Sequence, residues 1–166
     1  MADKGLDSLF SDTLKDIYYA EQQILKTLPE LEAAASTDEL KAAFKKHYEE
    51  TEGQVKRLDR VFELIGTSPS GKKCDGIEGI LKEGDSVLKE FKGTAAADAG
   101  LISSAQAVEH YEITRYGTLR RWAQMLGLTE AADLLGATLE EESRTDDLLT
   151  RLADAQANVK ANAAAG

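Results

Sequence analysis

Two glutamates stand three residues apart within Glu-His-Tyr-Glu-Ile, at Glu109 and Glu112, in the middle of a long helix-forming stretch, residues 97–126. Apolar or small residues recur around them at helical spacing, so both carboxylates fall on the stripe that should face a core. Burying an unpaired carboxylate is costly in free energy. The two acids therefore require partners from other segments of the chain.

The first half of the chain supplies matching residues on two predicted helices. A helix over residues 4–35 places Glu21 on its apolar stripe, and a helix over residues 38–65 places His47 on its own stripe. Glu50 follows His47 by three residues and lies at the edge of the same face. The two predicted helices therefore bring two acids and one imidazole toward a core.

The second half of the chain repeats this plan. A fourth long helix is predicted over residues 130–158, with Glu142 inward and Asp146 one turn further along, slightly to one side. Residues 66–75 are rich in glycine and serine and predict a loop, and a short helix is expected over residues 77–91. The loop and short helix form a long connection between the second and third long helices.

The ends of the helices carry recognisable signals. Ser36 followed by Glu39 forms a capping box that predicts the start of the second helix, with Thr37 as the competing cap. Thr129 is the predicted N-cap of the fourth helix. Pro29 is expected to bend the first helix or to mark a shorter one.

Tight turns make neighbouring helices antiparallel, so heights can be compared by counting residues from each turn. At about 1.5 Å rise per residue, the inward acids of each hairpin agree in height to within a turn. The predicted fold is all-α: a four-helix bundle with a long crossover, which contains a short helix, between helices 2 and 3. It forms one domain over residues 1–160, with a frayed tail at 161–166. The side chains expected in one layer are Glu21, His47, Glu50, Glu109, Glu112 and Glu142.

Five carboxylates cannot share a dry layer unless some are protonated or cations lie between them. Two divalent cations bring four or five carboxylates close to neutrality. Oxygen-rich ligation with one imidazole favours iron or manganese over structural zinc, so two iron or manganese ions are the predicted cofactors.

Tyr116 lies one turn from Glu112 and is a candidate to donate to a ligating carboxylate or to carry an electron. His110 is rotated about 100° from the stripe and is not expected to be a ligand.

The amino-acid composition argues against several other classes of function. Of 166 residues 42% are hydrophobic, which suits a globular domain, and the net charge of -10 opposes binding to nucleic acid. The single cysteine, Cys74, cannot form an internal disulfide and favours a reducing, cytoplasmic setting. Neither a signal peptide nor an apolar run long enough to cross a membrane is found in the sequence, so no membrane association is expected.

Three runs of residues resemble the YciE/YciF family of ferritin-like stress proteins. They are His-Tyr-Glu-Glu-Thr-Glu-Gly-Gln at 47–54, Glu-His-Tyr-Glu-Ile at 109–113 with Tyr-Gly-Thr-Leu at 116–119, and Glu-Glu at 141–142 near Asp-Asp-Leu at 146–148. The resemblance covers nearly the whole chain. It implies a ferritin-like bundle, a homodimer and a rubrerythrin-like dinuclear iron or manganese site, in which Glu109 and Glu112 look like the doubled glutamate of the third rubrerythrin helix.

The sequence departs from the ferritin and rubrerythrin pattern at one place. Those families use Glu-x-x-His on the second and fourth helices, whereas Glu50 is followed at that spacing by Gly53, and Glu142 by Thr145. Either one metal lacks a nitrogen ligand or His47 serves as a hydrogen-bonding partner of a ligand. Two residues are candidates to fill the gap: Gln54 and Asp146.

The first functional hypothesis is a dinuclear iron or manganese oxidoreductase that handles peroxide or dioxygen in stress, with an electron donor as partner. Glu21 and Glu142 are assigned as terminal ligands and Glu50 and Glu109 as bridges, with Glu112 exchanging with His47. The alternative is a non-catalytic stress or partner-binding bundle that keeps a vestigial or weak metal site. Iron storage is a third reading, but it needs a hollow shell that nothing in the sequence predicts.

Overall fold

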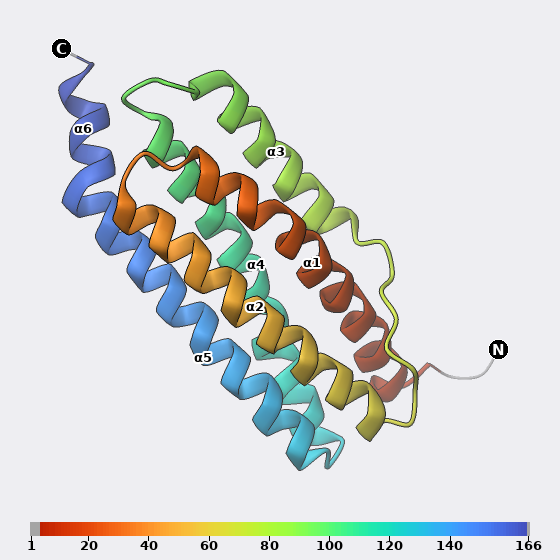
Figure 1. Ribbon diagram of the computed structural model, residues 1–166. Coiled ribbons are helices and arrows are strands. Elements are labelled where there is room, and N and C mark those ends of the chain that lie inside the picture. The colour runs from red at the N-terminus through yellow and green to blue at the C-terminus, as the bar shows by residue number, and fades with distance from the viewer. Residues whose placement is uncertain (1–3, 166) are drawn as a thin grey trace.

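The computed structural model describes residues 4–165, which fold into helices without any strand in that range. Figure 1 shows the order of the helices along the chain. The four long ones are α1 (Leu6–Ala34), α2 (Asp38–Leu64), α4 (Ala97–Met125) and α5 (Thr129–Leu152). The shorter elements are α3 (Asp75–Phe91), a π-helical segment η1 (Ala153–Ala157) and α6 (Asn158–Ala163).

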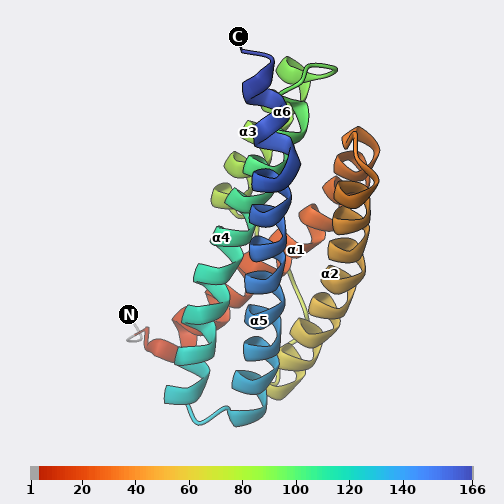
Figure 2. The ribbon, with the colours of Figure 1, turned by 90° about the vertical axis from the view of Figure 1, so that its left-hand side faces the viewer.

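The long helices form two antiparallel hairpins, α1–α2 and α4–α5, which pack against each other through α1 with α4 and α2 with α5 (Figures 1 and 2). The crossover helix α3 lies outside the four, against α4 and α1. The prediction of a four-helix bundle with a helix-containing crossover is confirmed. Among residues 4–165, no helix has the length and apolarity that crossing a bilayer requires.

The helix ends differ in part from the prediction. Gly66 follows α2 with φ of 70°, a left-handed conformation that glycine adopts without strain, and it ends the helix as expected. The predicted N-cap at Thr129 is wrong, because Leu128 precedes the helix and no side chain caps it. Helix α1 continues through Pro29 to Ala34, so the shorter-helix alternative is excluded. At the other end of the chain, α6 extends to Ala163, into the segment where fraying was expected.

The capping box at Ser36 is also wrong, and the competing cap, Thr37, is correct. The Thr37 hydroxyl accepts the backbone N–H of Leu40 at 3.3 Å. The Ser36 backbone N–H instead donates to Asp98 at 2.9 Å, and the Ser36 hydroxyl donates to the same carboxylate. Asp98 is 4% exposed and lies in the first turn of α4. A buried carboxylate from the other hairpin therefore engages Ser36 and ties the α1–α2 turn to α4.

Replacing Asp98 with Ala is expected to lower the free energy of unfolding by about 1–3 kcal/mol, because two donors at Ser36 lose a buried, charged acceptor. Urea denaturation measures the change. Asp85→Ala is the matched control, since the ion pair of Asp85 with Lys89 is exposed and should contribute little. Equal losses in the two variants would contradict the role given to Asp98.

Candidate metal centre

Four glutamates and one histidine are buried at one level of the bundle. The structure leaves Glu21 of α1, Glu109 and Glu112 of α4, and Glu142 of α5 each 0% exposed. His47 of α2 is 3% exposed. Every long helix therefore contributes one or two ionisable side chains to the interior, as the stripe pattern predicts.

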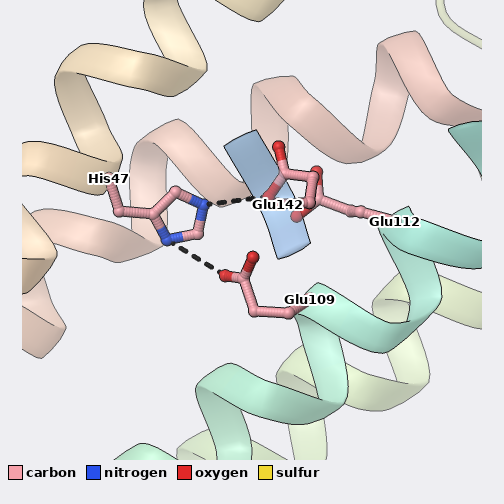
Figure 3. A group of neighbouring side chains, drawn as sticks. All are labelled: His47, Glu109, Glu112 and Glu142. Carbon is pink, nitrogen blue, oxygen red and sulfur yellow. Dashed lines mark ion pairs between the residues drawn. The ribbon is translucent and has the colours of Figure 1, made fainter. Parts of the chain in front are cut away.

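Four of these residues form a compact group, which Figure 3 shows. His47, Glu109, Glu112 and Glu142 each offer a nitrogen or oxygen atom, and these atoms all lie within 4.8 Å of one another. The His47 ring lies between two carboxylates, with Nδ1 3.2 Å from Glu109 and Nε2 3.8 Å from Glu142. The group contains one imidazole and three carboxylates, and it could hold a metal ion.

Most of the polar atoms in this layer have no hydrogen-bond partner. Both oxygens of Glu109 and Glu112 are unpartnered, and neither nitrogen of His47 has the geometry of a hydrogen bond. One oxygen each of Glu21 and Glu142 is also unpartnered. Orphaned buried polar atoms are rare and costly, so this many in one layer need an explanation. Bound cations would account for them, because each carboxylate oxygen and one nitrogen of the neutral His47 ring can offer a lone pair.

Burial changes the protonation of the whole layer. Loss of hydration, reinforced by the charge of Glu142, raises the pKa of Glu21 to about 8. Loss of hydration likewise raises the pKa of Glu142 to about 7. The same cause raises the pKa of Glu109 and of Glu112 well above the usual range, and burial lowers the pKa of His47 to about 4. Without a cation the layer is therefore close to neutral, with protonated acids beside a neutral imidazole.

Two neighbours occupy the remaining carboxylate oxygens. The Tyr116 hydroxyl, fully buried on α4, donates to Glu21, and the Gln54 amide of α2 donates to Glu142. Glu21 and Glu142 therefore keep one free oxygen each, whereas Glu109 and Glu112 keep both. The four carboxylates are thus divided into two kinds by their hydrogen bonds.

The sequence profile of a family described as a domain of unknown function, DUF892, matches residues 5–162. This chain belongs to the DUF892 family. It is 43% identical to Protein YciF of Escherichia coli over 159 residues, which cover 95% of this chain and 96% of YciF. The resemblance to the YciE/YciF family is confirmed.

Two solved structures of related proteins have the same fold as this chain. The crystal structure of the E. coli stress protein YciF matches with a TM-score of 0.88 at 41% identity, over 96% of this chain and 99% of that one. YcfI of Rhodopseudomonas palustris, described as a candidate structural protein, matches with a TM-score of 0.86 at 42% identity, over 90% and 96% of the two chains. The ferritin-like fold is confirmed by these matches.

Two of the expected site residues, Glu50 and Asp146, have their partners outside the buried layer. Glu50 has a 19% exposed side chain, which pairs with Lys46 at 3.2 Å and accepts the Thr145 hydroxyl at 3.4 Å. Asp146 accepts the Gln106 amide at 3.0 Å and lies 3.2 Å from the exposed His110. The edge position of Glu50 lets a surface lysine reach it, and His110 points away from the layer as predicted.

One hydrogen-bond network beside the site was not predicted from the sequence. Arg57 of α2 donates to both oxygens of Glu141 at 2.7 and 2.6 Å, and to Thr138 at 3.2 Å. Glu141 also accepts the Gln54 amide at 3.3 Å. The available signal was the three-residue spacing of Gln54 and Arg57 on one helix, opposite the adjacent acids Glu141 and Glu142.

Proposed function

We propose that this chain holds two iron or manganese ions in its buried carboxylate layer and reacts with peroxide or dioxygen there. The observation that carries the proposal is the convergence of unpartnered, fully buried carboxylate and imidazole atoms from all four long helices. One imidazole among several carboxylates is the ligand set that suits iron or manganese better than structural zinc. When bound, such ions supply the redox steps that peroxide or dioxygen reduction requires.

The hydrogen bonds support a specific division of ligand roles. Glu21 and Glu142 each have one oxygen free, so they are proposed as terminal ligands. Glu109 and Glu112 each have two free oxygens, so each is able to bind two cations at once. Glu112 would therefore take the place proposed for Glu50 in holding the two cations together with Glu109, and His47 would supply the nitrogen ligand.

The chain's own side chains also manage protons and water. The acids of the layer are protonated when no cation is bound, so uptake of cations releases their protons. Tyr116 keeps its proton on the hydroxyl that it donates to Glu21, because burial and the adjacent acids raise the pKa of that phenol well above its usual value. The complete burial of the four glutamates keeps bulk water from the reacting centre.

Reconstitution of the untagged, full-length protein with Fe²⁺ or Mn²⁺ is expected to give two bound ions per chain by elemental analysis. His47→Ala should weaken binding by about tenfold or more, because it removes the nitrogen ligand of the layer. His110→Ala is the control, since its side chain is 68% exposed and pairs with Asp146. Fewer than about one ion per chain in the parent protein would contradict the proposal.

A non-catalytic bundle with a weak site is the second candidate. The position of Glu50 outside the compact group favours it, and so does the description of the R. palustris relative. The two candidates differ in peroxide consumption, since the metal-loaded protein should turn peroxide over rapidly only in the first. The description of E. coli YciF as a stress protein supports a stress role under either candidate.

The proposed setting is cytoplasmic, with a homodimer and an external electron donor as partners. The only cysteine, Cys74, is free and buried, which suits a reducing compartment. Sizing chromatography tests the assembly, since a dimer elutes far from the void volume at which an iron-storing cage would appear.

A further inference from the structure

A continuous chain of hydrogen bonds runs from the partly exposed Arg57 to the buried carboxylate of Glu142. The Arg57 guanidinium holds both oxygens of Glu141 at 2.7 and 2.6 Å. Glu141 accepts the Gln54 amide nitrogen at 3.3 Å, and the same nitrogen donates to Glu142. Both amide hydrogens of Gln54 are thereby used, one on each of two adjacent acids of α5.

We propose that Gln54 is a positioning residue that holds Glu142 with one oxygen turned toward His47, and that Arg57 acts through Glu141 to hold Gln54 in place. The inference deepens the proposed function and rests on it. Both roles are donor roles, because neither the Gln54 amide nitrogen nor the Arg57 guanidinium has a lone pair to offer a cation, whereas Gln54 Oε1 has no hydrogen-bond partner.

The geometry explains why an amide is needed at Gln54. Its donor group fixes Oε1 of Glu142 and leaves Oε2 unpartnered, 3.8 Å from Nε2 of His47. Without a donor, a carboxylate on a flexible side chain has several rotamers and either oxygen is able to face the imidazole. The Gln54 amide therefore reduces the rearrangement that Glu142 must undergo when a cation binds.

Arg57 fixes the amide in turn. A guanidinium grips a carboxylate through two parallel hydrogen bonds, a geometry that lysine does not reproduce. With Glu141 locked, Gln54 must present its NH₂ group to both acids, because its carbonyl would repel them. Glu141 also neutralises Arg57, so that a positive charge near the layer does not oppose cation binding.

The test measures Mn²⁺ affinity by titration calorimetry on the cation-free, full-length protein. Gln54→Met keeps the volume and removes the donor, and it is expected to weaken binding by about 10- to 100-fold. Arg57→Lys keeps the charge and should weaken binding less. The double variant should bind as weakly as Gln54→Met alone, because Arg57 acts through Gln54. Arg60→Lys is the matched control on the same helix, since its ion pairs with Glu63 and Glu130 are exposed.

Two further readouts separate positioning from a loss of folding. Thermal unfolding of the cation-free variants checks that each remains folded, and the visible absorption of bound Co²⁺ should change in Gln54→Met but not in Arg60→Lys. The inference alone would be overturned if Gln54→Met bound Mn²⁺ within about twofold of the parent. It would also be overturned if the losses of Mn²⁺ affinity in the two single variants multiplied in the double variant. Absence of Mn²⁺ binding by the parent would overturn the proposed function together with it.

Discussion

Saturation of the protein with Mn²⁺ is expected to raise its free energy of unfolding by about 4 kcal/mol for each site when the free ion is at 1,000 times its dissociation constant. The ligand set exists only in the folded chain, because its residues come from α1, α2, α4 and α5 and are far apart in sequence. For a chain of 166 residues, this corresponds to a rise in the melting temperature of about 8–16 °C per site.

Calorimetric or spectroscopic melting with and without Mn²⁺ measures this effect. The variant Glu109→Gln with Glu112→Gln keeps the shape of both side chains and removes the two carboxylates that have both oxygens free. It should lose most of the rise. Mg²⁺ at the same concentration should stabilise the parent less, because it gives up its hydration water reluctantly and does not favour imidazole. An undiminished rise in the double variant would mean that Mn²⁺ binds elsewhere.

The interior position of the acids was predictable because a helix repeats every 3.6 residues and charges on its apolar face stand out. Glu21, Glu109, Glu112 and Glu142 all lie on such stripes, and each is fully buried. Counting residues from the two tight turns then predicted their common height. His47 could be placed in the same way, and it faces two of these acids. Periodicity and loop length were sufficient for this much of the fold and site.

Side-chain partners across helices could not be predicted from these patterns. Glu50 lies at the edge of its stripe, where the choice between core and surface depends on a rotamer and on the nearby Lys46. Ser36 has a good local partner in the capping box, yet it bonds to Asp98, which is 62 residues away. The link between Arg57 and Glu141 spans 84 residues and likewise depends on how the two hairpins meet. Helix periodicity gives the face on which a residue lies but does not determine its partner on another helix.

The cation-free protein is expected to lose stability as the pH rises through neutrality, because its buried acids hold protons only when the chain is folded. The pKa of Glu21 is raised from 4.5 to about 8, and that of Glu142 from 4.5 to about 7. Between these values the folded chain binds protons that the unfolded chain has released. The free energy of unfolding therefore falls with pH, by about 1.4 kcal/mol per pH unit for each such group.

His47 has the opposite effect over a lower range. Burial lowers the pKa of His47 from 6.5 to about 4, so between these values the unfolded chain binds the extra proton and stability rises with pH. Above about pH 6.5 this compensation ends, while the acids of the layer continue to titrate. The steepest loss of stability is therefore expected between about pH 6.5 and 7, and a smaller loss continues to about pH 8 through Glu21.

Urea midpoints measured at intervals from pH 5 to 8 test this dependence in chelated protein. Glu112→Gln should make the fall in the free energy of unfolding less steep by about 1.4 kcal/mol per pH unit, because it replaces a buried acid with an amide that does not titrate. Saturating Mn²⁺ should remove the decline, since cations displace the protons from the folded layer and bind more tightly as the pH rises. A midpoint that stays constant from pH 6.5 to 8 without cations would show that the carboxylates are already ionised in the folded chain. Their charges would then have to be balanced by some group other than a proton or a bound metal ion.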